Sequence, residues 1–165
     1  MFSESAVPAT RRGARIRFVA VHGAVAAAIA VWLIARYGAG LQLHTPGFAP
    51  GQHPASLGLG LVAIASAVAS VAAWGAVKLI ERTSSRPGRA WIAAGLLATV
   101  VSLSAPLAGH GITLAERLTL VGMHLAVAAV LIPAFALTIS RRRPAATAAS
   151  VRGQEQPVAS VRSAA

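Results

Sequence analysis

Three ionisable residues inside an apolar stretch are the part of this sequence best suited to chemistry. Glu116, Arg117 and His124 all fall in one apolar run, at about residues 113–139. His124 is 11 residues into that run, about 16 Å along a helix, and Arg117 lies about two turns earlier on the same face. Ionisable groups at such depth in a membrane span are costly and are often functional. One hypothesis is therefore a polar track that binds an anion or a small ligand, or that relays protons.

A structural interpretation of the same residues stays open. In that interpretation His124 is neutral and bonded to a neighbouring helix, while the Arg117 side chain extends to the aqueous interface. Thr99 and Ser102 lie in the preceding apolar run. They are the weakly polar groups that we expect to face the interior beside His124.

The other histidines suggest cofactors less clearly. His22 and His124 lie in different apolar runs and would be the axial ligands of a b-type haem, but their depths differ by about 6 Å at helical rise. His44, His53 and His110 lie between the runs and lack the tight spacing of a metal site. We therefore predict no cofactor and no metal, with the haem kept as a weaker alternative.

Several residue types and motifs are missing. The sequence has no cysteine and no aspartate, which excludes disulfides, cysteine-ligated zinc and iron–sulfur clusters. It has no glycine-rich phosphate loop, no nucleophile elbow and no His-Glu-x-x-His motif. The first apolar run has no carboxylate of the kind that a small proton-coupled multidrug exporter needs. A non-enzymatic protein is the expectation.

The elements that carry these residues are predicted to be membrane-spanning helices. Apolar residues make up 56% of the 165 residues and charged residues only 12%, and about 20 apolar residues suffice to cross a bilayer. We predict an all-α, four-transmembrane-helix bundle over residues 16–140, with a basic segment before it (1–15) and a disordered basic tail after it (141–165). The predicted spans are about 16–36, 57–80, 90–109 and 113–139. A cleaved signal peptide is the competing interpretation of the first run, which is longer than such peptides usually are.

The basic residues predict the orientation. Of the 15 basic residues, only Arg36 and Arg117 fall on the side of the bundle opposite to the two termini. Cytoplasmic segments carry the excess of Lys and Arg, so both termini are expected in the cytoplasm of a bacterial cell, with the helices in the plasma membrane. The same rule accounts for the net charge of +11 without a nucleic-acid partner.

Small residues are expected to mediate helix packing, since lipid gives apolar faces no reason to leave it. The fourth run has small residues at helical spacing, and that face is predicted to point inward: Ala115, Thr119, Gly122, Ala126, Ala129 and Pro133. Pro106 and Pro133 are predicted to kink their helices. Such faces also permit a homo-oligomer or another membrane-protein partner beside the lipid bilayer itself.

Two short segments resemble a known family. They are Ser102-Leu103-Ser104-Ala105-Pro106-Leu107 and the segment from Met123-His124 to Ile132-Pro133. With the Gly38/Gly40 exit from the first run and Glu81-Arg82 at the end of the second, they are similar to the DUF6069 family of uncharacterised four-span membrane proteins of actinobacteria. The resemblance covers about residues 16–140 and implies the architecture but no activity.

Three functions remain as hypotheses. The first is a small non-enzymatic accessory or sensory membrane component. The second is a small-solute or proton-conducting transporter that uses the polar track at Glu116, Arg117 and His124. The third and weakest is a haem-binding electron carrier.

Overall fold

The computed structural model describes residues 9–49 and 53–140. The predicted tail (141–165) and the first eight residues of the predicted basic segment lie outside the described residues. The main elements, in chain order, are α1 (Ala9–Leu33), the π-helical turn η1 (Ile34–Gly38), α2 (Leu59–Thr83), α3 (Pro87–Ala108) and α4 (Leu114–Ser140).

The four α-helices are long and apolar enough to cross a membrane. Their apolar residues and their lengths agree with the roughly 30 Å of hydrocarbon that a span must cross. The prediction of an all-α, multi-pass membrane protein is confirmed. α1 begins earlier than the apolar run because its first turns continue through the basic stretch around Arg12 and Arg15.

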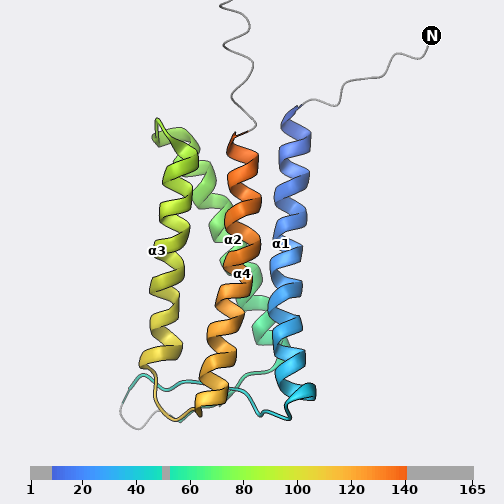
Figure 1. Ribbon diagram of the computed structural model, residues 1–165, viewed down its shortest axis with the longest axis vertical. Coiled ribbons are helices and arrows are strands. Elements are labelled where there is room, and N and C mark those ends of the chain that lie inside the picture. Colours follow the sequence, from blue (N-terminus) through green and yellow to red (C-terminus); the bar gives the residue numbers. More distant parts are fainter. Residues whose placement is uncertain (1–8, 50–52, 141–165) are drawn as a thin grey trace, which may run out of the picture.

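The helices form an antiparallel bundle with two distinct ends (Figure 1). α1 begins and α4 ends at one end, called here the terminal end, where residues 84–86 also join α2 to α3. The opposite end, called the loop end, holds the α1–α2 and α3–α4 connections. α4 lies between α1 and α3, and α2 runs obliquely behind α4, so that it approaches α3 at the terminal end and diverges from it toward the loop end.

Alanines on α1 pack against large side chains on α4. Ala20, Ala24 and Ala28 recur every four residues on one face of α1 and are buried. They belong to two core clusters whose α4 members are larger: Leu131, Phe135 and Ile139 in one, and Leu120 and Met123 in the other. Small residues on one helix let large residues on the next approach its backbone closely.

The small-residue face predicted for α4 was wrong. Ala115, Ala129 and Pro133 are exposed, because the larger residues of α4 fill the space beside the small residues of α1. Pro106 is buried and Pro133 exposed, and both lie inside continuous helices.

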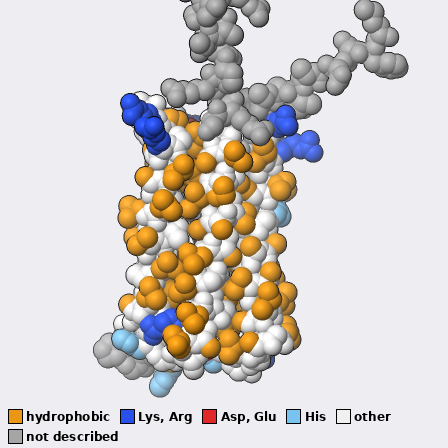
Figure 2. Space-filling view, in the orientation of Figure 1, with side chains coloured by type: hydrophobic (Ala, Val, Ile, Leu, Met, Phe, Trp, Pro, Cys, Tyr) orange, Lys and Arg blue, Asp and Glu red, His pale blue; other side chains and the backbone are white. Residues whose placement is uncertain are grey.

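The outer surface of the bundle is apolar. Large hydrophobic side chains such as Val68, Val100 and Leu118 are more than 60% exposed. Figure 2 shows hydrophobic side chains over the shaft of one face and basic side chains near its ends. A soluble monomer rarely exposes so much contiguous apolar surface, which agrees with a lipid environment around the shaft.

Backbone pairing orders the loop end. β1 (His44–Thr45) pairs with β2 (Ala55–Ser56) as a short antiparallel ribbon. Gly47 and His110 exchange two backbone hydrogen bonds of 3.1 Å, which tie the α1–α2 connection to the α3–α4 turn. Backbone hydrogen bonds therefore join the two connections at the loop end to each other.

Candidate functional site

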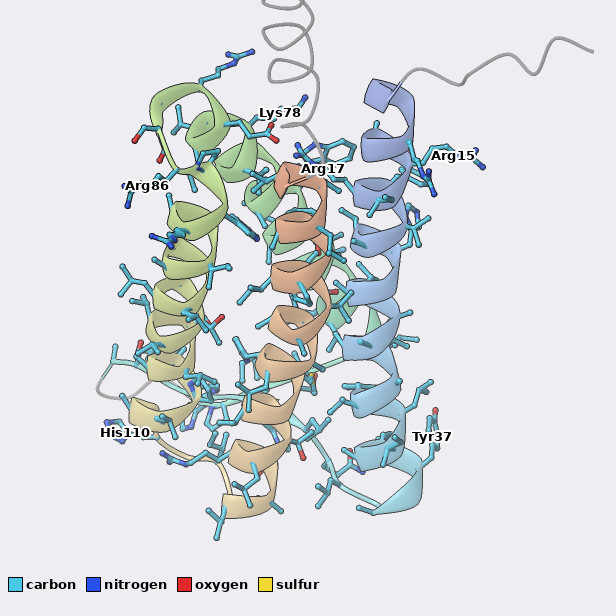
Figure 3. The ribbon with its side chains drawn as sticks, turned by 45° about the horizontal axis from the view of Figure 1, so that its top comes forward. Arg15, Arg17, Tyr37, Lys78, Arg86 and His110 are labelled. Carbon is cyan, nitrogen blue, oxygen red and sulfur yellow. The ribbon has the colours of Figure 1, made fainter. Side chains whose placement is uncertain are left out.

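A largely buried ion pair lies near the terminal end, and its arginine links three helices. The guanidinium Nη2 of Arg17 on α1 lies 2.6 Å from Oε1 of Glu81 on α2, and the side chains are 4% and 13% exposed. Arg17 Nε also donates to the hydroxyl of Thr138 on α4 at 2.9 Å. In Figure 3 Arg17 points between the helices, whereas Arg15 projects away from the bundle. Arg17 therefore connects α1, α2 and α4.

Glu116 has partners at the loop end. Its Oε2 accepts from the backbone N–H of Thr113 at 2.7 Å, and its own N–H donates to the Thr113 hydroxyl at 3.3 Å. This reciprocal pair is a capping box, which satisfies N–H groups that the start of a helix leaves without partners. Its Oε1 lies 2.6 Å from Nδ1 of His44 on β1. Glu116 thus stabilises the start of α4 and fastens the α1–α2 connection to it.

Arg117 caps the preceding helix. Its guanidinium donates to the backbone carbonyls of Leu107 and Gly109, at the end of α3. A cation near the last carbonyls of a helix is favourable because those groups lack partners within the helix. Neither Glu116 nor Arg117 lines the cavity beside His124 that is described below. The structure therefore does not join the three predicted residues into one track.

His124 lies deep in the bundle, ten residues after the start of α4, which is about 15 Å at helical rise. Its Nδ1 is 2.7 Å from the backbone carbonyl of Leu120. Because a carbonyl only accepts, Nδ1 carries the hydrogen, and in a neutral imidazole Nε2 is then an acceptor. No hydrogen bond to Nε2 is present within residues 9–49 and 53–140.

A cavity of about 530 Å³ lies beside His124. Its walls come mainly from α2, α3 and α4, and most of its lining side chains are alanine or other apolar residues. The wall residues Ala65, Ala69 and Ala72 of α2 and Ala98 of α3 are exposed, so the cavity opens between these two helices. His124 is the one ionisable residue in its wall.

The remaining polar side chains of the cavity wall are bonded to backbone carbonyls. Thr99 donates to Gly95 O at 2.8 Å and Ser102 donates to Thr99 O at 2.8 Å. Ser66 on α2 donates to Val62 O at 2.6 Å. The structure therefore brings the predicted Thr99 and Ser102 to the same cavity as His124 and adds Ser66 to them.

Trp91 lines the cavity on the side nearer the terminal end. Its Nε1 donates to the carbonyl of Ile132 at 3.0 Å, and its ring contacts Phe135 with centroids 5.5 Å apart. Gly95 lies one turn further on α3, where an added Cβ would lie 3.0 Å from Cγ1 of Ile132. The indole and this close approach hold α3 against α4.

The other predicted histidines lie elsewhere. His22 is exposed on α1, its Nδ1 lies 2.9 Å from Phe18 O, and it is not part of the cavity wall. It therefore shares no site with His124. His44, His53 and His110 are at the loop end, and the described residues contain no group of three possible metal ligands.

Sequence reasoning missed the two features that are built from distant residues. Arg17 and Glu81 are 64 positions apart, and each stands beside other charged residues that face solvent. The cavity arises from where α2 crosses the bundle, which residue spacing does not encode. The sequence gives one indication of the cavity: alanine recurs along α2, and a helix face of alanines leaves space beside it.

Comparisons with known proteins identify the family. A family model described as a family of unknown function, DUF6069, matches residues 8–141, which include all four helices. A search of curated proteins and a search of solved structures found no match. The matched region covers most of the chain, so this protein belongs to the DUF6069 family.

Proposed function

We propose that this protein is a small non-enzymatic accessory or sensory component of a bacterial plasma membrane, and that it binds an apolar molecule drawn from the bilayer. The observation that supports this proposal is the cavity between α2, α3 and α4. Its volume of about 530 Å³ lies within the range of small-molecule sites, which are mostly apolar with a few polar groups. A lipid-soluble molecule reaches the opening between α2 and α3 without leaving the membrane.

The transporter alternative lacks comparable support. Glu116 and Arg117 hold helix ends at the loop end, and the cavity wall has no carboxylate, lysine or arginine. A path for protons or anions needs successive polar groups across the membrane. The arrangement favours a binding site within the membrane over such a path.

Filling the cavity tests the proposal. Ala98→Phe places a ring in the wall, whereas Val100→Phe, two residues away on α3, places the same ring on the 67% exposed outer surface. The full chain is released from lipid nanodiscs, and the apolar molecules that remain bound are measured by native mass spectrometry. We expect Ala98→Phe to lose bound molecules and Val100→Phe to keep them. Equal retention by both variants would contradict the proposal.

We also propose that both termini lie in the cytoplasm. Among the described residues, Arg36 and Arg117 belong to the parts of the chain at the loop end, and the other basic residues belong to the parts at the terminal end, which is the distribution that the positive-inside rule gives for cytoplasmic termini. The chain has no cysteine, so single cysteines report on accessibility. A membrane-impermeant thiol reagent should label His53→Cys in intact cells and should label Ser85→Cys only after lysis. The opposite pattern would reverse the orientation.

A further inference from the structure

The hydrogen bonds of the cavity wall define what it can recognise. The side-chain donors in the wall are the hydroxyls of Ser66, Thr99 and Ser102, the indole N–H of Trp91 and Nδ1–H of His124. Each of them is bonded to a backbone carbonyl. A hydroxyl that donates still has lone pairs that accept, and Nε2 of His124 has one as well. The wall therefore presents acceptors to an occupant.

The acceptors also have a defined position. Ser66 and His124 lie seven and ten residues from the loop-end starts of α2 and α4, about 10 and 15 Å along their helices. Toward the terminal end the wall becomes apolar, with Ala73, Ala76 and Leu131. An occupant with one polar end and an apolar body matches this division.

Charge restricts the occupant further. The wall contains no Asp, Glu, Lys or Arg, and an unpaired charge is costly in such surroundings. An uncharged occupant is therefore better suited to this wall than an ion.

Building on the proposed function, we propose that the cavity binds a neutral lipid-like alcohol whose hydroxyl donates a hydrogen bond to Nε2 of His124. The hydroxyl lies at the level of His124, in the half of the cavity nearer the loop end. The hydrocarbon body extends along the alanine face of α2 toward Trp91. A ketone, ester or ether of the same shape lacks the hydrogen that this wall can accept.

The test compares two ligands that differ only at the terminal oxygen, which carries a hydrogen in one and a methyl group in the other. The full chain is reconstituted in phosphatidylcholine nanodiscs and titrated with 9,10-dibromo-octadecan-1-ol or with its methyl ether. Bromine quenches tryptophan on contact, and Trp91 contacts Ile132, which is eight residues beyond His124 on α4, or about 12 Å. A Trp91→Phe variant should lose the saturable quenching, which shows that Trp91 is the reporter.

We expect the alcohol to bind about three- to tenfold more tightly than the ether, as one hydrogen bond allows. His124→Phe should abolish this difference. His22→Phe should preserve it, because His22 makes the same kind of bond to the carbonyl four residues earlier but lies outside the cavity wall. The alcohol–ether comparison in the unaltered protein stands even if His124→Phe does not fold.

The outcomes separate the two proposals. Saturable quenching that is equal for alcohol and ether would overturn the hydroxyl inference and leave the apolar binding site in place. No saturable quenching by either ligand, together with equal retention by the Ala98→Phe and Val100→Phe variants, would overturn both.

Discussion

Replacing Arg17 by methionine should destabilise the bundle more than any other single loss of charge among the described residues. The change removes the cation that lies 2.6 Å from Glu81 and the donor to Thr138. Exposed ion pairs contribute about 0.2–1 kcal/mol, but removal of one partner from a buried pair costs about 3–5 kcal/mol because the other charge stays in poor surroundings. Arg17 is 4% exposed and Glu81 is 13% exposed, so this pair lies between the exposed and the fully buried class. We therefore expect the free energy of unfolding to fall by about 1–3 kcal/mol.

The double variant Arg17→Met/Glu81→Met tests the cause of that loss. Because it removes both charges and keeps apolar volume, it should recover most of the lost free energy. Unfolding is followed by tryptophan fluorescence as dodecyl sulfate is added to mixed micelles, since Trp32 and Trp91 are buried in the folded bundle. Arg15→Met, an exposed neighbour on α1, is the control and should change stability by less than about 0.5 kcal/mol. A loss below about 1 kcal/mol in Arg17→Met, or no recovery in the double variant, would refute this reasoning.

Two further predictions use the same unfolding measurement. Gly109→Ala should lower the free energy of unfolding by about 1–3 kcal/mol, because the new Cβ would overlap the ring of Pro46. Gly75→Ala is the control: its new Cβ meets nothing within 4 Å, and the change should stabilise α2 by about 0.5–1 kcal/mol. Equal effects of the two substitutions would contradict the described packing of the loop end. Trp91→Phe should cost at least about 1 kcal/mol through loss of its hydrogen bond to Ile132, and an unchanged free energy of unfolding would show that this bond does not hold α3 to α4.

The architecture was predictable from the sequence because long apolar runs leave few alternatives in a membrane. The capping box of Thr113 and Glu116 was also readable, since it depends on a three-residue spacing. The polar-track hypothesis instead grouped Glu116 with Arg117 and His124.

Packing was harder to predict than the spans. Small residues occur on several faces of α1, and the structure buries the series Ala20, Ala24 and Ala28. A shift of one residue turns a helix face by about 100°. Hydropathy does not resolve such a rotation, because lipid and helix interior are equally apolar.

α2 is held near both of its ends and faces the cavity in between. Glu81 joins it to α1 near one end, and Trp32 donates to the carbonyl of Leu57, just before the other end, at 2.9 Å. Between these points Ser66 and Ser70 donate to carbonyls four residues earlier, a pattern that tends to bend helices. α2 is therefore fixed near both ends, so a displacement at its middle would change its curvature and leave its ends in place. If the cavity binds molecules as proposed, we expect occupants of different width to be accommodated by a change in the curvature of α2 between these two attachments.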